Sequence, residues 1–209
     1  MKIAVGYCYY NDVESIKRGI PTFVNSVDYV FAIDGKFSLR EGEDYSNDGS
    51  TEYLEQFKNV IIRKFVGMEH DKRNQYLDLA REYEIDVLLI IDSDEYVLEA
   101  DWDLFRKNLE NVKENISGVK FYYNEKDWTP YPRIWKRPNE IRYYKTHNIF
   151  RVQGNLIRSP VVKHVEGISM GMGDDLRSDE YLKGTSEYQR KMLDYEIPIR
   201  HALRDGKLK

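Results

Sequence analysis

The fold is decided by the stretch Asp86-Val87-Leu88-Leu89-Ile90-Ile91-Asp92-Ser93-Asp94-Glu95. Residues 87–91 are five consecutive aliphatic residues, and such a run predicts a strand buried on both faces, as in parallel sheets that are covered by helices. Three of the next four residues carry carboxylates, which repel one another at this spacing unless a cation neutralises them. The stretch therefore predicts a central strand that ends in an acidic turn.

The chain before this strand alternates between strand-like and helix-like segments. Three apolar runs have the length of strands: residues 2–7, 29–33 and 60–66. A segment with apolar residues at helical spacing follows each of these runs, over 13–23, over 51–57 and from 71 onwards. Asn11 with Glu14 fits a capping box before the first helix, and Asp71 is a candidate N-cap of the third. The alternation predicts right-handed crossovers and a mostly parallel, doubly wound sheet.

The pattern changes after the fourth predicted strand. Apolar spacing predicts one amphipathic helix over 102–116, and Asp101 with Asp103 suits its N-terminus because the helix dipole favours acidic groups there. Short alternating segments then predict antiparallel strands that join the parallel sheet, at residues 119–123, 134–135 and 149–152. A last helix is expected over 186–195. We therefore expect a single α/β domain over residues 1–209.

Composition excludes several classes of protein. Acidic residues outnumber basic ones 36 to 32, and the net charge of −4 argues against general DNA binding. Cys8 is the only cysteine, which excludes an internal disulfide and a zinc site built from cysteines. The longest aliphatic run is far shorter than a bilayer span, and residues 1–10 lack the pattern of a secretory leader. We expect a cytoplasmic protein without a membrane span or a specific nucleic-acid partner.

Two features of the second half allow more than one interpretation. Residues 120–164 contain ten basic and three acidic residues, which would suit a non-enzymatic module that binds phosphate or RNA. Aromatic residues gather in the same region, at positions 121–123, 128, 131 and 135. They are either half-buried core or a platform on which an acceptor sugar stacks, and the sequence does not separate these two possibilities.

Polar residues follow three of the predicted strands: Tyr10-Asn11, Asp34-Gly35 and the acidic turn at 92–95. Ligands of open α/β sheets bind beyond the carboxyl ends of the strands, so these residues would share one edge. Mg²⁺ or Mn²⁺ accepts one or two carboxylates and completes its shell with phosphate oxygens. Asp-x-Asp triplets also arise by chance, and Asp101-Trp102-Asp103 is a second one. The position of Asp92-Ser93-Asp94 directly after a buried strand favours a metal–diphosphate role over a solvated turn.

Seven segments follow one another along the chain: Lys2 to Asp12, Asp34-Gly35, Asn47-Asp48-Gly49-Ser50-Thr51, Arg73-Asn74, Ile91 to Glu95, Asn148-Ile149-Phe150-Arg151 and Val162 to Glu166. In this order they resemble motifs of the family-2-type glycosyltransferases with the GT-A fold, including the Tyr-Asn loop after the first strand and the Asp-x-Asp motif. The resemblance covers roughly residues 2–166. The small size resembles minimal GT-A enzymes of archaea and their viruses, and a viral member would act in the cytoplasm of its host.

The resemblance implies a metal-dependent glycosyltransferase, of the hexosyltransferase class, that moves a sugar from a nucleoside-diphosphate donor to a glycan, protein or lipid-linked acceptor. Cys8 and Tyr10 would border the base of the donor. Asp34 would accept a hydrogen bond from this base, and Arg73 would reach the ribose or the diphosphate. By the same resemblance, residues 1–100 would form a nucleotide-binding half and the remainder, 101–209, an acceptor-side half.

The resemblance also implies a metal centre. Asp94 would hold Mn²⁺ or Mg²⁺ directly, and Asp92 would contact the ribose or a metal-bound water. His164 would be a further ligand and would shift the preference towards Mn²⁺, because nitrogen donors suit the softer ion. The alternative for His164 is a histidine at a strand end that bonds to a backbone carbonyl.

The acceptor side would need a base if the enzyme inverts the anomeric centre, because a carboxylate must then take the proton of the acceptor hydroxyl. The candidates are Asp174 and Asp175, which would otherwise belong to an exposed acidic loop, or Glu166. An enzyme that retains the configuration needs no such base.

Two other enzyme classes share parts of this pattern. Phosphatases of the haloacid-dehalogenase type also have Asp-x-Asp after a hydrophobic strand, but Tyr96 stands where they usually have Thr or Val, and the motif here follows the fourth predicted strand rather than the first. A nucleotidyltransferase would share the nucleotide-binding geometry, although its glycine-rich Arg/Lys loop is absent after the first strand. The nucleotidyltransferase and the phosphate- or RNA-binding module are the alternatives to the glycosyltransferase.

Overall fold

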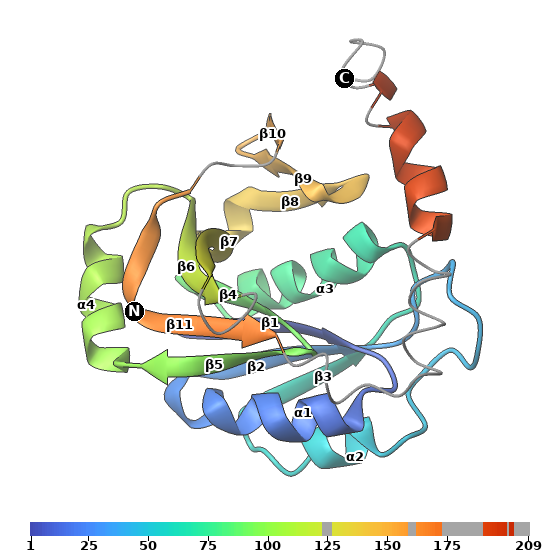
Figure 1. Ribbon diagram of the computed structural model, residues 1–209, viewed down its shortest axis with the longest axis horizontal. Coiled ribbons are helices and arrows are strands. Elements are labelled where there is room, and N and C mark those ends of the chain that lie inside the picture. Colours follow the sequence, from blue (N-terminus) through green and yellow to red (C-terminus); the bar gives the residue numbers. More distant parts are fainter. Residues whose placement is uncertain (123–126, 159–161, 173–189, 200, 203–209) are drawn as a thin grey trace.

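The computed structural model of this chain describes residues 1–122, 127–158, 162–172, 190–199 and 201–202. Its centre is a sheet of eight strands in the order β3-β2-β1-β4-β7-β6-β11-β5 (Figure 1). The first half of the chain supplies four neighbouring parallel strands: β1 (Ile3–Tyr9), β2 (Tyr29–Asp34), β3 (Val60–Lys64) and β4 (Val87–Asp92). The rest of the chain supplies β5 (Glu95–Ala100), β6 (Ile116–Tyr122), β7 (Trp128–Lys136) and β11 (His164–Met172). Both pairings of β7 and the pairing of β11 with β5 are antiparallel, so the predicted mixed α/β sheet is confirmed.

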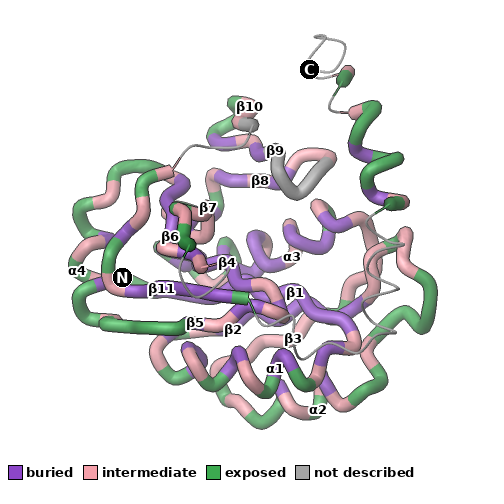
Figure 2. Tube along the Cα trace, in the orientation of Figure 1, coloured by how far each residue is buried: buried purple, intermediate pink, exposed green. Residues whose placement is uncertain are grey.

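The two faces of this sheet are covered by different elements. Three helices pack on one face: α1 (Val13–Gly19), α2 (Ser50–Leu54) and α4 (Trp102–Asn111). The longest described helix, α3 (Glu69–Glu82), packs on the opposite face against β1 and β2. Figure 1 shows α1 and α2 below the sheet and α3 above it, and Figure 2 shows the buried stretches along β1 and β11. Short 3-10 turns complete the connections: η1 (Ile20–Thr22), η2 (Val24–Ser26) and η3 (Pro138–Glu140).

A second, smaller sheet lies on the α3 side of the molecule. It has the order β10-β9-β8 and consists of antiparallel strands: β8 (Ile141–Tyr144), β9 (Thr146–Val152) and β10 (Asn155–Arg158). The sequence predicted that residues 149–152 join the main sheet, and this is wrong. Aromatic packing holds the small sheet in place instead, because the ring of Trp135 on β7 lies 4.6 Å from Tyr143 and 5.1 Å from Phe150.

Several predicted helix ends also differ from the structure. The side chain of Asp48, and not a capping box of Asn11 and Glu14, accepts the free N–H of Val13 at 2.9 Å. The third helix, α3, begins at Glu69, so Asp71 lies inside its first turn. Asp101 does cap α4 and accepts the N–H of Leu104 at 2.9 Å, as predicted.

The end of α4 and the strand β5 were also not predicted. The helix stops at Asn111 because Val112 has an extended backbone, and Ile116 instead opens β6. Directly after the acidic turn the chain forms β5, which the sequence did not indicate. Residues 190–199 are helical, in partial agreement with the expected helix over 186–195, whose first four residues lie outside the described part. None of the helices in the described ranges is long and apolar enough to cross a membrane.

The close contact between β1 and α3 generates the first prediction. An ideal Cβ atom at Gly6 would lie 2.8 Å from Cγ of Tyr76, whose ring is fully buried. We expect Gly6→Ala to lower the free energy of unfolding by about 1–3 kcal/mol, because the ring must shift within a packed core. Urea denaturation measures this change.

The same substitution in a Tyr76→Leu background provides the matched control. Without the ring, the added methyl group of Gly6→Ala meets no aromatic atom, so its effect on the free energy of unfolding should be smaller by about 1 kcal/mol or more. Equal effects in the two backgrounds would show that the ring is not the cause.

Candidate active site

The topology brings the predicted polar residues to one edge of the main sheet. Cys8 of β1 pairs with Ile33 of β2 on one side and with Asp92 of β4 on the other. Tyr9 pairs with Asp34, so the carboxyl ends of the three strands lie next to one another. This is the edge at which open α/β sheets bind their ligands.

An ion-pair network surrounds the first carboxylate of the acidic turn. Asp92 lies between two arginines: Nη1 of Arg73 is 2.8 Å from one carboxylate oxygen, and Nη2 of Arg133 is 3.2 Å from the other. Arg73 comes from α3 and also pairs with Glu69 at 2.9 Å. Arg133 comes from β7 and also pairs with Glu95. The repulsion expected within the acidic turn is therefore relieved by two basic groups from distant parts of the sequence.

Burial makes this network sensitive to the loss of either partner. Glu95 is only 4% exposed, and its second oxygen accepts the backbone N–H of Asp92 at 2.9 Å. Burial raises the pKa of Glu95 to about 7, although the neighbouring Arg133 lowers it. Burial also disfavours the charged form of Arg133, but Glu95 and Asp92 outweigh it, and the pKa of Arg133 is raised. The opposite charges of Arg133 and Glu95 thus neutralise each other at the start of β5.

Further hydrogen bonds fix the turn between β4 and β5. The hydroxyl of Ser93 donates to Asp12 at 2.6 Å, and its carbonyl accepts from the hydroxyl of Tyr7 at 3.2 Å. Asp94 is partly exposed on this turn. Over the described ranges there is no group of three His, Cys, Asp or Glu side chains that could enclose a metal ion. The partly exposed carboxylate of Asp94 is of the type that a hard cation accepts together with phosphate oxygens, whereas both oxygens of Asp92 are already paired with arginines.

A small cavity of about 50 Å³ lies beside this turn, and seven residues line it: Cys8, Tyr9, Tyr10, Phe37, Arg40, Lys72 and Ser93. Its most unusual member is Lys72 of α3, which is 1% exposed. The ammonium group of Lys72 donates to the carbonyl of Tyr9 at 2.7 Å and to the carbonyl of Gly35. Burial lowers the pKa of Lys72 to about 8 and raises the pKa of the Cys8 thiol to about 11. The cavity is therefore built around one buried amino group.

The loop over residues 36–49 closes this cavity on one side. Asp34 is fully buried and accepts from the backbone N–H of Ser46 at 3.1 Å, from its hydroxyl at 2.7 Å and from the hydroxyl of Thr51 at 3.3 Å. The hydroxyl of Tyr10 donates to the carbonyl of Glu43 at 2.7 Å. In this arrangement Asp34 and Tyr10 hold the loop against the strand ends.

The structure does not bring His164 to this edge. His164 opens β11, whereas Met172 at the other end of β11 pairs with Glu95. Eight residues of strand correspond to about 26 Å, so His164 and Asp94 are too far apart to share one ion. Glu166 lies near the same far end of β11. The two other candidate bases, Asp174 and Asp175, are outside the described residues.

Sequence reasoning missed three residues of this site: Lys72, Glu95 in its role as an ion-pair partner, and Arg133. The signal for Lys72 was weak, because a lysine next to Arg73 looks like an ordinary exposed helix residue. Arg133 did carry a signal. It directly precedes the apolar pair Ile134-Trp135 in a predicted strand, where a charged residue requires a partner.

The network around Arg133 yields a stability prediction. Arg133→Met leaves the buried Glu95 and one oxygen of Asp92 without their partner, so we expect the free energy of unfolding to fall by about 3–5 kcal/mol. Arg137 provides the control, because its side chain is exposed, pairs with Glu140 at 3.6 Å and donates to the side chain of Asn115 at 2.9 Å. Arg137→Met should therefore change the free energy of unfolding by less than about 1 kcal/mol. Urea denaturation of both variants measures the difference.

A second substitution separates lost charge pairing from lost packing. If the uncompensated carboxylate causes the effect, Glu95→Gln in the Arg133→Met background should recover part of the lost stability. No recovery would mean that Arg133 acts through its packing alone.

Lys72 yields a pH-dependent prediction. In the folded protein the pKa of Lys72 is about 8, and the unfolded chain has the ordinary value of 10.5. Between these two pH values the unfolded state binds more protons, so the wild type gains stability relative to Lys72→Met as the pH rises. The gain across this window should approach roughly 3 kcal/mol. Urea denaturation of both proteins from pH 7 to pH 11 tests this. The free energy of unfolding of the wild type minus that of Lys72→Met should increase with pH, and a decrease would contradict the prediction.

Comparisons with known proteins agree with the fold. No protein-family model and no curated protein matches the chain. The crystal structure of S. aureus TarS 1-349 in complex with UDP-GlcNAc is similar over 88% of this chain and 61% of that chain, at 14% identity and a TM-score of 0.59. A second crystal structure of S. aureus TarS 1-349 is similar over 63% of this chain and 39% of that one, at 17% identity and a TM-score of 0.49.

A third structure is the mannosyltransferase PcManGT from Pyrobaculum calidifontis in complex with GDP-Man and Mn²⁺, similar over 65% of this chain and 44% of that one, at 14% identity and a TM-score of 0.45. The chain thus spans at most 61% of the length of each of these three structures. The likeness to the TarS complex confirms that this chain has a GT-A-like fold.

Proposed function

We propose that this chain is a glycosyltransferase that moves a sugar, of the hexose class, from a nucleoside-diphosphate donor to an acceptor. The observation that carries the proposal is the acidic turn at 92–95, which lies at the carboxyl end of β4 beside Arg73 and Arg133 in a GT-A-like fold. The similar TarS structure contains UDP-GlcNAc, so a UDP-sugar is the first donor to test.

A divalent cation, Mn²⁺ or Mg²⁺, belongs to the proposal, with Asp94 as its direct ligand and Asp92 beside it. The partly exposed carboxylate of Asp94 is the kind of donor that hard cations prefer. When bound, such a cation neutralises the negative charge that develops on the diphosphate leaving group. Arg73 and Arg133 would add positive charge at the same edge, because Asp92 holds both guanidinium groups there.

The nucleotide would bind at the cavity beside Cys8 and Tyr10, with residues 1–100 as the nucleotide-binding half. Binding pockets for small molecules and cofactors usually measure about 300–1,000 Å³. The cavity of about 50 Å³ is therefore too small for a nucleoside while the loop over 36–49 lies against Tyr10. We propose that donor binding moves this loop and frees Asp34 to accept a hydrogen bond from the base.

The acceptor would bind on the side of residues 101–209. The acceptor is a glycan, a protein or a lipid-linked molecule. If the reaction inverts the anomeric centre, Asp174 or Asp175 would take the proton from the acceptor hydroxyl.

The acidic turn provides the test of this function. Asp94→Asn should reduce cation-dependent turnover by more than about a hundredfold, because an amide is a far poorer ligand for a hard cation and several kcal/mol of transition-state stabilisation are lost. Turnover is measured as the release of nucleoside diphosphate from UDP- and GDP-sugars in the presence of Mn²⁺ or Mg²⁺. The electron paramagnetic resonance of Mn²⁺ reports the affinity for the cation separately.

The chain offers a matched control in its second Asp-x-Asp triplet. Asp103 lies in the first turn of α4 and is exposed, so Asp103→Asn should leave both turnover and Mn²⁺ affinity unchanged. Undiminished turnover in Asp94→Asn, with the control also active, would refute the proposed role of the acidic turn.

A further inference from the structure

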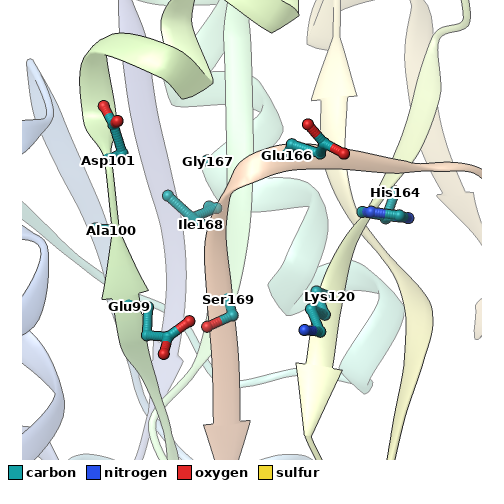
Figure 3. Close-up of a pocket in the computed structure, with 9 residues that line it drawn as sticks. All are labelled: Glu99, Ala100, Asp101, Lys120, His164, Glu166, Gly167, Ile168 and Ser169. Atoms are coloured by element: carbon teal, nitrogen blue, oxygen red, sulfur yellow. The ribbon is translucent and has the colours of Figure 1, made fainter.

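A second and much larger cavity lies away from the acidic turn. Its volume is about 460 Å³, and nine residues of β5, β6, β11 and their connections line it (Figure 3): Glu99, Ala100, Asp101, Lys120, His164, Glu166, Gly167, Ile168 and Ser169. Glu99 is four residues beyond Glu95 on β5, which places the cavity about 13 Å or more from the acidic turn. Neither the proposed donor nor the proposed cation uses any of these residues.

Three polar side chains form a row across the middle of this cavity. Ser169 on β11 pairs with Glu99 on β5 and with Lys120 on β6, so the three side chains lie on the same face of the sheet. Figure 3 shows the hydroxyl of Ser169 between the carboxylate of Glu99 and the side chain of Lys120. The row therefore offers an acceptor, a hydroxyl and a donor side by side.

The hydroxyl of Ser169 lacks a hydrogen-bond partner within the described part of the chain. Ser169 is only 3% exposed, and leaving a buried hydroxyl without a hydrogen-bond partner is unfavourable. A ligand hydroxyl that enters the row would supply the missing partner. This unpaired group distinguishes the cavity from an ordinary solvated depression.

The walls of the cavity are rigid. The carbonyl of Gly167 accepts the backbone N–H of Asp101 at 2.7 Å, and a Cβ atom at Gly167 would lie 2.5 Å from the backbone nitrogen of Phe105 in α4. Gly167 also has a φ of +118°, a conformation that favours glycine. The close packing of β11 on α4 thus shapes the cavity before any ligand arrives, which reduces the entropy lost on binding.

The charges around the cavity disfavour an anionic ligand. Three carboxylates, those of Glu99, Asp101 and Glu166, would repel a phosphate group. Lys120 in the central row repels an alkylammonium group at that point, whereas the three carboxylates attract it, so a polyamine is the competitor to test. Hydroxyl groups both donate and accept hydrogen bonds, and they match a row in which a carboxylate and an ammonium group flank a serine.

An aromatic surface adjoins the cavity. The ring of Trp128 is 43% exposed, lies 5.3 Å from the ring of His164 and has the ammonium group of Lys120 5.1 Å from its centre. An exposed indole next to polar groups binds ligands that have one apolar and one polar side. A sugar ring has this character, with C–H groups on its faces and hydroxyls at its edge.

We propose that this cavity binds a neutral saccharide, with the hydroxyls of the sugar in the Glu99–Ser169–Lys120 row and one ring against Trp128. The volume of about 460 Å³ is within the usual range for small-molecule pockets. The binding itself does not depend on the proposed transferase activity. Its use as an anchor for an acceptor glycan rests on that proposed function.

Nuclear magnetic resonance titration of the full chain tests this inference. The probes are three neutral trisaccharides (maltotriose, cellotriose and mannotriose), with spermidine and inorganic phosphate as ionic competitors for the same cavity. We expect at least one trisaccharide to shift the amide signals of Lys120, His164 and Ser169 and the indole signal of Trp128. The signals of Cys8 and Ser93, next to the small cavity, should stay unchanged.

Two variants sharpen the test. Glu99→Gln should weaken trisaccharide binding about tenfold or more, because it removes a charged hydrogen-bond acceptor. Glu110→Gln, at an exposed position of α4, should leave the affinity unchanged. The proposal is overturned if no trisaccharide shifts these signals, if only spermidine or phosphate does, or if Glu99→Gln binds like the parent. A saccharide that still binds when Asp94→Asn has no turnover supports the cavity independently of the transferase.

Discussion

The acidic turn is held in place by Asp92 between two arginines from different layers of the molecule. Arg73 comes from α3, and Arg133 comes from the antiparallel strand β7, at 2.8 Å and 3.2 Å from the two carboxylate oxygens. Without these two guanidinium groups, the carboxylates of Asp92, Asp94 and Glu95 would repel one another at the end of a buried strand. The same contacts tie the parallel half of the sheet to its antiparallel half, so the shape of the site and the packing of the fold depend on one cluster.

The charged groups at this edge differ in how far they are buried. Glu95 and Lys72 are buried and bonded to protein groups. Burial raises the pKa of Glu95 and lowers the pKa of Lys72, which favours the neutral form of each. Asp94 is partly exposed on the same turn. The buried pair of Arg133 and Glu95 fixes the start of β5 next to the partly exposed carboxylate of Asp94. A carboxylate that is held in position before binding suits a site that recognises a charged ligand. Loop 36–49 lies against the strand ends at the same edge, because the backbone N–H and the hydroxyl of Ser46 both donate to Asp34, and the proposed binding of the donor would release these bonds.

The antiparallel half of the sheet gives the molecule a second polar surface. Strand β5 turns back from the acidic turn and pairs with β11 (Figure 1). It therefore extends from the proposed donor edge to the large cavity, which Glu99 and Ala100 line. The aromatic residues of this half divide accordingly. Phe121 and Trp135 are 1% exposed and belong to the cores, whereas Trp128 is 43% exposed beside the cavity. The interpretation as core is thus confirmed for Phe121 and Trp135, whereas a stacking platform for a sugar at Trp128 stays a proposal.

The sequence by itself determined the parallel half of the fold, because strand and helix periodicities are local. The uninterrupted aliphatic run at 87–91 also has to be buried on both faces, as it is in a sheet that helices cover. The sequence also located Asp92 and Asp94 at a strand end, since a buried strand has to end where polar residues begin. Only the tertiary structure decided the partners of these residues. Arg133 reaches Asp92 through the antiparallel pairing of β7 with β4, and a strand pairing between segments about 40 residues apart leaves no periodic trace in the sequence. The register of β11 with β5 and β6 places His164 at the far end of β11, so the histidine that the order of motifs assigned to the proposed cation instead lines a different cavity.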